Sequence, residues 1–279
     1  MAKDFVQVNR AISEDGTEIV GQVKGQGPPL VLLPAGPGDS KTTWRFMLPF
    51  LSEHFTCYLV DTRGRGLSAD SADHSLKRLV QDIVAFIKSI GEQVGLLEWG
   101  STLWIHCYAR DTTNIAAIAA YEPGLDDMLS EYAALQLEEL FTRMGSMVSD
   151  GKLAEAVDIF IENGSLLYTE ADLASGAPED FWMNSTSNFD IFFREEELIA
   201  ASKEPGPSHP SLLAKIDVPV LLLEGSATKT WFKDSVLYME HHLPDSTVRQ
   251  VVGTTHFGPY LKPEAIATEL ISFFKEHLG

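Results

Sequence analysis

The chain has 279 residues, of which 44% are hydrophobic, so it can bury a large core as one domain with an insertion or as two domains. Its 40 Asp and Glu residues outnumber 21 Lys and Arg, and the formal net charge of −19 repels phosphate backbones and anionic lipid surfaces. We therefore expect neither a nucleic acid nor a membrane as a partner.

Cysteine use and the N-terminal residues indicate a compartment. Cys57 and Cys107 stand in apolar runs at no metal-binding or redox spacing, so buried free thiols are expected. No stretch has the features of a signal peptide, and none reaches the roughly eighteen apolar residues of a membrane helix. These features predict a cytoplasmic protein.

Short β-like runs alternate with helix-length amphipathic segments, which is typical of an α/β protein with a mainly parallel sheet. The first two runs flank Asp15 and Gly16 and predict a hairpin. The predicted strands cover residues 5–12, 17–23, 29–33, 55–61, 94–97, 115–121, 218–225 and 247–252. The predicted helices outside the interval described next cover residues 42–51, 76–90, 101–110, 233–242 and 263–277.

One long interval shows helical periodicity and no strong strand signal. It contains MLSEYAALQLEELFTRM and GKLAEAVDIFIENG and lies between two predicted strands. We expect it to form a helical cap, residues 125–211, over a core domain made of residues 1–124 and 212–279. A homodimer is left open as an alternative to a monomer.

No cofactor or metal is expected. There is no G-x-G-x-x-G opening a helix after a strand. The adjacent His241 and His242 point in different directions on a helix and make a poor metal site.

Three motifs in order resemble the α/β-hydrolase fold: LVLLPAGPGDSKTTW, LVDTRGRGLS and VVGTTHFGPYLKPEAIATELISFF. The resemblance implies a mostly parallel eight-stranded sheet flanked by helices, with an inserted helical cap. The first motif corresponds to the HGGPG loop, where the amide of Gly36 would face an oxyanion although Pro34 and Ala35 replace the usual His-Gly. The second matches D-x-R-G-x-G-x-S.

The third motif places His256 where this fold carries its catalytic histidine. The usual acid position after the seventh strand falls on Ala227 and Thr228, neither of which can orient an imidazole as a carboxylate does. Glu122 ends the sixth strand, in AAYEPG, and resembles the acid found there in zearalenone-type lactonases and haloalkane dehalogenases. Alternatively, His256 could be a structural histidine, and Glu122 could be a helix-capping or exposed residue.

The nucleophile is expected within LLEWGSTLW, residues 96–104. The elbow G-x-S-x-G requires small residues two before and two after the nucleophile, and neither Ser101 nor Thr102 satisfies this at both places. The stretch from Glu98 to Glu122 resembles the haloalkane dehalogenase segment that begins D-W-G-S, and epoxide hydrolases share D-W-G. The resemblance puts Glu98 in the place of the nucleophilic Asp, with Trp99 as the matched halide donor.

Several chemistries remain open at this site. Glu98 could attack carbon to give an ester that water, activated by His256, hydrolyses, although Glu reaches about 1 Å further than Asp. Alternatively Glu98 and His256 could act as base and acid in isomerisation, epimerisation, cyclisation or elimination. The remaining interpretations are an ester or lactone hydrolase that uses Ser101 or Thr102, and an inactive binding protein.

The expected substrate is an apolar small molecule, because aromatic residues are frequent in the predicted cap and in the loop after the seventh strand. The residues expected to line its pocket are Gly36, Trp99, Tyr168, Phe181, Trp182, Phe192, Phe193, Trp231, Phe232 and Phe257.

Overall fold

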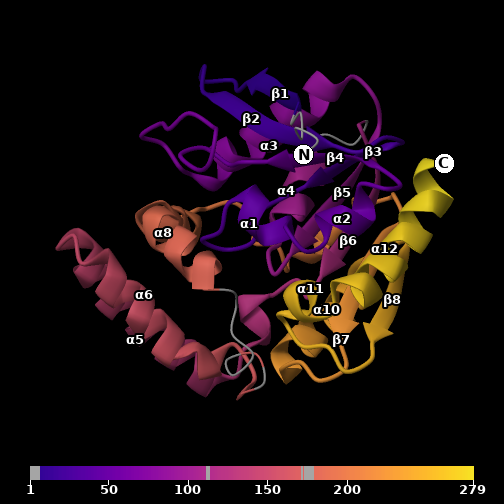
Figure 1. The fold of residues 1–279 in the computed structure, drawn as a ribbon. Helices are drawn as coiled ribbons and strands as arrows, with labels where there is room; N and C mark the ends of the chain where they lie inside the picture. The colour runs from indigo at the N-terminus through magenta and orange to yellow at the C-terminus, as the bar shows by residue number, and fades with distance from the viewer. Residues whose placement is uncertain (1–6, 111–113, 171, 173–178) are drawn as a thin grey trace.

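A computed structural model describes residues 7–110, 114–170, 172 and 179–279, apart from the side chains of residues 161, 164 and 179–187 (Figure 1). Eight strands form one sheet in the order β1-β2-β4-β3-β5-β6-β7-β8. They are β1 (Gln7–Ile12), β2 (Glu18–Lys24), β3 (Pro29–Leu32), β4 (Thr56–Val60), β5 (Val94–Trp99), β6 (Ile115–Tyr121), β7 (Val220–Gly225) and β8 (Ser246–Val251).

The direction of the strands confirms the predicted fold. β1 pairs with β2, and β2 with β4, in antiparallel fashion, and every other neighbouring pair is parallel. β3 and β5 are buried along their whole length, and β6 and β7 are buried at all positions but one. Strands buried on both faces are typical of a parallel sheet covered by helices on each side.

Two apolar layers cover the two faces of the sheet. One contains side chains of α3 (Leu76–Ile90), α4 (Leu103–Arg110) and α10 (Thr230–His242). The other is built from α1 (Ser40–Trp44), α2 (Leu48–Leu51), α11 (Gly258–Leu261) and α12 (Pro263–Leu278). Because the strands are parallel, their carboxyl ends gather at one edge, where ligands meet sheets of this kind.

The predicted helix at 42–51 is two short helices instead. Asp39 caps α1 through its side chain, which accepts from the amide of Thr42 at 2.7 Å. Pro49 lies in the first turn of α2, where proline favours a new helix start. The break therefore follows from local chemistry that the apolar periodicity did not reveal.

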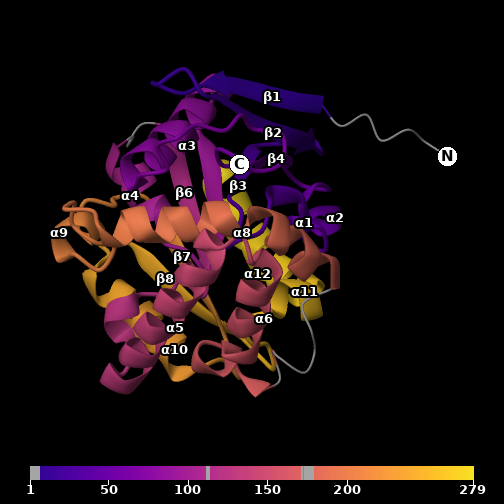
Figure 2. The ribbon, with the colours of Figure 1, turned by 90° about the vertical axis from the view of Figure 1, so that its left-hand side faces the viewer.

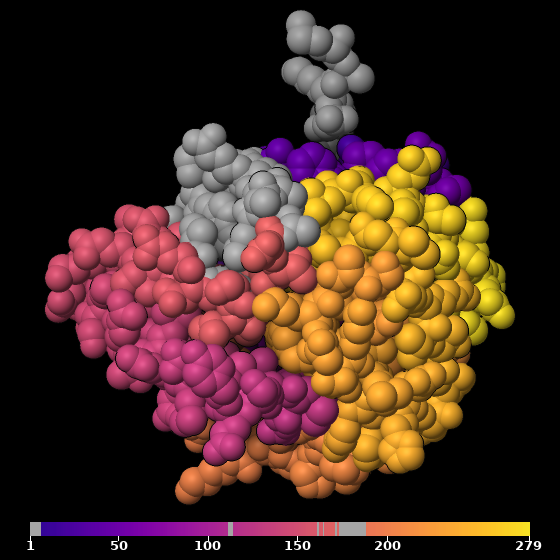
Figure 3. Space-filling view, turned by 90° about the horizontal axis from the view of Figure 1, so that it is seen from below, coloured from indigo at the N-terminus to yellow at the C-terminus, as the bar shows by residue number. Residues whose placement is uncertain are grey.

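A helical insertion connects β6 to β7. It comprises η1 (Asp126–Met128), α5 (Glu131–Ser149), α6 (Leu153–Glu162), η2 (Gly164–Leu166), α8 (Glu179–Ala200) and α9 (Pro210–Leu213). Helices α5, α6 and α8 share an apolar cluster around Met144, Phe160 and Phe189, apart from the two layers of the sheet. Figure 2 shows α8 crossing in front of the sheet, and Figure 3 shows the insertion against the orange residues that follow it. The predicted domain boundaries stay a prediction.

Candidate active site

The turn between β5 and α4 has Gly100 at its apex. Gly100 adopts a positive φ of 72°, and its amide donates to the carbonyl oxygen of Tyr121 at 3.0 Å. In the elbow of this fold, such a strained strand-to-helix turn presents the nucleophile. A Cβ placed on Gly100 would lie 3.2 Å from His256 Nε2. The residue that faces the histidine therefore has no side chain.

The structure corrects the predicted place of Glu98, which lies two residues before the apex, inside the strand. β5 extends through Trp99, pairing Glu98 with Ala120 and Trp99 with Tyr121, whereas the apolar run predicted a strand that ends at Leu97. The longer strand moves the apex from Glu98 to Gly100. None of the hydrogen bonds of the described residues joins Glu98 to His256, and the catalytic role of Glu98 remains a prediction.

Glu98 is almost fully buried at the start of α4. Its Oε2 accepts from the amide of Trp104 at 3.1 Å. Burial raises the pKa of Glu98 to about 7, although hydrogen bonds from Trp104, Ser101 and Leu103 favour the charged form. Glu98 also lines the cavity between the sheet and the insertion, so a carboxyl group with a raised pKa faces the space that a ligand could occupy.

His256 and Glu122 are brought together. His256 Nδ1 lies 3.0 Å from Glu122 Oε2. Glu122 also accepts from the Gly225 amide at 2.7 Å and from Thr228 Oγ1 at 2.8 Å. Its backbone has a positive φ of 46°, a strained conformation for a residue other than glycine, which functional sites often contain. Thr228, at the position where the fold usually has its acid, supports the acid instead.

Aromatic rings fix the plane of the His256 imidazole. Phe232 stacks on it at 4.3 Å between centroids and 10° between planes, and Tyr168 of the insertion stacks at 5.3 Å and 24°. Trp99 approaches it at 5.6 Å in a tilted arrangement. With Nδ1 held by Glu122, these contacts direct Nε2 towards Gly100.

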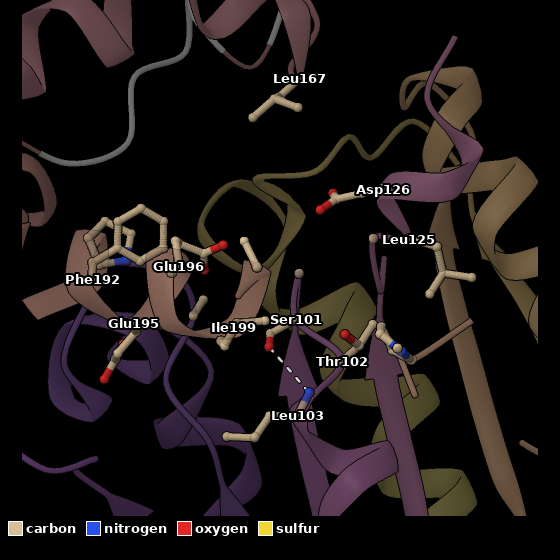
Figure 4. Close-up of a pocket in the computed structure, with 18 of the residues that line it drawn as sticks. Ser101, Thr102, Leu103, Leu125, Asp126, Leu167, Phe192, Glu195, Glu196 and Ile199 are labelled. Carbon is tan, nitrogen blue, oxygen red and sulfur yellow. Dashed lines mark hydrogen bonds between the residues drawn. The ribbon is translucent and has the colours of Figure 1, made fainter. Parts of the chain in front are cut away.

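A cavity of about 900 Å³ lies between the sheet and the insertion, and Figure 4 shows part of its lining. Most of the predicted lining residues do line it: Gly36, Trp99, Tyr168, Phe192, Phe193, Trp231, Phe232 and Phe257. Trp231 Nε1 donates to the carbonyl oxygen of Leu167, which fixes its ring against the insertion. The side chains of Phe181 and Trp182 lie outside the described residues.

The loop after β3 supplies one candidate oxyanion contact. Gly36 has a positive φ of 44° and lines the cavity. The loop is held by Thr43 Oγ1, which accepts from the Ala35 amide at 3.2 Å, and by Trp44 Nε1, which donates to the Leu33 carbonyl at 2.7 Å. The amides of Gly36 and of Ser101, the residue after the apex, correspond to the two donors that an oxyanion hole of this fold uses.

The sequence did not predict a cluster of charged residues where the insertion forms part of the cavity wall. Arg65 forms an ion pair with Glu195 of α8, and Glu196 and Asp126 line the same cavity. Burial and the nearby carboxylates of Asp126 and Glu195 raise the pKa of Glu196 to about 7. Nothing in one sequence indicates that residues so far apart in the chain meet.

Neither a membrane span nor a metal cage occurs in the part of the chain that the structure describes. No described helix is long and apolar enough to cross a bilayer. Groups of three or more His, Cys, Asp or Glu side chains suited to a metal ion are likewise absent from the described residues.

Comparison with known proteins identifies the family. The model of the alpha/beta hydrolase family matches residues 30–269. The structure is similar to an alpha/beta hydrolase from Sphaerobacter thermophilus, with 23% identity over 95% of this chain and 100% of the other and a TM-score of 0.75. It is also similar to a thermophilic esterase from Thermogutta terrifontis, with 17% identity over 98% of this chain and 100% of the other and a TM-score of 0.80. A haloalkane dehalogenase variant from Bradyrhizobium elkanii has 18% identity over 97% of each chain and a TM-score of 0.66. No curated protein matches the sequence. The chain belongs to the alpha/beta hydrolase family.

Proposed function

We propose that this protein is a hydrolase without a protein nucleophile, in which His256 activates the attacking water directly. One observation carries the proposal. The apex of the elbow is Gly100, where a Cβ would lie 3.2 Å from His256 Nε2, while Glu122 holds the opposite nitrogen at 3.0 Å. A histidine oriented by an acid is the general base of this fold, and the missing side chain leaves room for water beside it.

The proposed step is hydrolysis of an ester or lactone. His256 Nε2 accepts a proton from water, and the water oxygen attacks the carbonyl carbon. The resulting oxyanion faces the amides of Gly36 and Ser101. When the carbon–oxygen bond breaks, the imidazolium returns the proton to the leaving alkoxide, which gives an acid and an alcohol. Glu122 keeps the imidazole in one orientation and stabilises its charged form.

A second candidate function uses Glu98 in proton transfer. Its carboxyl group lines the cavity, and burial raises its pKa to about 7, which suits a group that both accepts and donates a proton near neutrality. With His256 as its partner it would isomerise or eliminate without covalent chemistry. Attack on carbon by Glu98 is the weaker variant, because its Oε2 is occupied by the Trp104 amide.

Single turnover in water enriched in heavy oxygen tests the proposed hydrolysis. With aryl esters and aliphatic lactones as substrates, the label is expected in the product acid, and the mass of the protein should not change. His256→Ala should lower kcat/KM by about 10²- to 10⁴-fold, since general-base catalysis contributes that much. The matched control is His241→Ala, on the exposed side of α10, which should retain activity.

Other outcomes separate the alternatives. An acyl group on Ser101 or Thr102, or label in the Glu98 carboxylate, would show a protein nucleophile and exclude direct water attack. Exchange of a substrate hydrogen for deuterium that disappears in Glu98→Gln would favour proton transfer. Ligand-induced thermal stabilisation without any product would identify a binding protein.

A further inference from the structure

The peptide groups on either side of His256 are held from two directions. On the side of the core, the Tyr121 hydroxyl group donates to the carbonyl oxygen of Thr255 at 2.5 Å. On the side of the insertion, Asp172 Oδ1 accepts from the amide of Phe257 at 3.0 Å. The backbone that carries the histidine is therefore fixed by the core and the insertion together.

The second oxygen of Asp172 fixes the carboxylate within the insertion. Asp172 Oδ2 accepts from the Thr169 amide at 2.9 Å and from Thr169 Oγ1 at 2.6 Å, and Thr169 Oγ1 accepts from the Asp172 amide at 3.1 Å. These reciprocal bonds have the pattern of a capping box. Asp172 is almost fully buried and is not among the described residues that line the cavity. It therefore contacts the histidine loop without contacting the space for substrate.

Tyr168 adds a contact with the imidazole itself. Its ring stacks on that of His256 at 5.3 Å between centroids and 24° between planes, and it packs against the Phe257 ring at 5.2 Å. An imidazole in this stack cannot turn Nε2 away from Gly100 without losing the contact. The insertion thus acts on both the backbone and the ring of the histidine.

The segment that carries Tyr168 and Asp172 is bound to the core near its start, in its middle and at its end. We call residues 165–170 and 172 the strap. Lys229 Nζ donates to the Ser165 carbonyl at 2.7 Å, and Trp231 Nε1 donates to the Leu167 carbonyl at 3.2 Å. These contacts at the start of α10, together with those at the histidine loop, fix the place of the strap on the core.

We propose that Tyr168 and Asp172 are positioning residues through which the strap orders the general base, His256. The inference rests on the proposed hydrolysis and names the regulation of its base, because His256 is in place only while the strap is bound to the core. Losing the Asp172 carboxylate removes an acceptor from the Phe257 amide. A displacement of the base on the order of 1 Å can lower the rate about a hundredfold.

Asp172→Ala separates positioning from substrate binding. With 4-nitrophenyl butyrate as substrate, kcat is expected to fall about 10- to 100-fold, because the base is displaced. KM should stay within about threefold, because Asp172 does not line the cavity. The matched control is Asp158→Ala, which removes an exposed acid from α6 of the same insertion and should retain both constants.

Two substitutions of Tyr168 test the ring, and they keep the proposal testable if Asp172→Ala does not fold. Tyr168→Leu should lower kcat about 10-fold or more, whereas Tyr168→Phe, which retains the stacking ring, should keep kcat within about threefold. Equal kcat values for the two variants would contradict the positioning role of the ring.

A spectroscopic measurement tests the position of His256 without any substrate. The ring protons of His256 can be followed in histidine-labelled protein and assigned by their absence in His256→Ala. Because Trp99, Tyr168 and Phe232 surround the imidazole, their ring currents make these resonances sensitive to its place. The resonances are expected to move in Asp172→Ala and to stay unchanged in Asp158→Ala.

The outcomes distinguish the two proposals. Moved resonances in Asp172→Ala, with no hydrolysis by the unmodified protein, would refute the proposed hydrolysis alone. Hydrolysis by the unmodified protein that Asp172→Ala retains at full kcat would refute the positioning role alone. Unchanged resonances in Asp172→Ala, or equal effects in Asp172→Ala and Asp158→Ala, would also overturn that role.

Discussion

Glu98 occupies the position where the elbow of this fold usually has a small residue, and Gly100 occupies that of the nucleophile. The Glu98 side chain lies at the start of α4, where it accepts from the Trp104 amide. A carboxylate there compensates amides that a helix start leaves without partners. The same burial that makes this contact possible disfavours the charged form, so the residue contributes a dependence of stability on pH.

We expect Glu98→Gln to make the protein less sensitive to pH. Folding raises the pKa of Glu98 from 4.5 to about 7, so between these values the folded state retains a proton that the unfolded chain has released. Stability is therefore lost as pH rises through this window, by about 3 kcal/mol in total. The free energy of unfolding of the variant, minus that of the unmodified protein, should increase by about this amount from pH 4 to pH 8 in denaturant titrations.

The control for this prediction is Glu240→Gln, an exposed acid of α10, for which the same difference should stay constant with pH. Glu196, whose pKa is also raised to about 7, is present in both proteins and cancels in the comparison. A constant difference for Glu98→Gln would contradict the raised pKa.

At the scale of elements, the strands were predicted closely from the sequence. The turn between β5 and α4, on which the site depends, was predicted least well. All eight strands were predicted: the first two from the hairpin turn at Asp15 and Gly16, and the central ones from apolar runs, because buried parallel strands are nearly continuous in hydrophobicity. The end of β5 depends instead on its pairing with β6, which continues through Trp99 and Tyr121. Pairing is a tertiary property, so matching the letters E-W-G-S placed the apex two residues early.

Gly100→Ser should convert the elbow into one that carries a reactive serine. A Cβ at this position meets only the His256 ring, at 3.1 Å from Cε1 and 3.2 Å from Nε2, so the ring must move by a few tenths of an ångström. The positive φ of 72° adds strain of about 1–2 kcal/mol. A fluorophosphonate is expected to label residue 100, as detected by peptide mass spectrometry.

Labelling should disappear in Gly100→Ser/His256→Ala, because the serine then has no base. The unmodified protein, which has Ser101 next to the apex, should not be labelled. A folded Gly100→Ser protein that resists the reagent would show that Gly100 does not occupy the nucleophile position.

At the scale of the whole molecule, the site exists only where the insertion meets the sheet. His256, Glu122 and the loop of Gly36 could be predicted, since each lies in a motif at the end of a strand. The stacking of Tyr168 on His256, and the pairing of Arg65 with Glu195, could not be predicted because neither leaves a local pattern. This ring stack and this ion pair connect the insertion to the core, together with the hydrogen bond from the Phe257 amide to Asp172 at 3.0 Å.

Arg65→Met should therefore loosen the insertion. It would leave Glu195 buried beside Glu196, with His74 Nδ1 at 3.5 Å as its remaining ionisable contact. Removing one partner of a buried ion pair costs about 3–5 kcal/mol, whereas replacing both partners with apolar side chains is often close to neutral. We expect faster amide hydrogen exchange in α8 for Arg65→Met, and recovery of most of the protection in Arg65→Met/Glu195→Met. If the double variant exchanged as fast as the single one, the loosening would come from loss of the ion pair itself and not from the unpaired, buried Glu195.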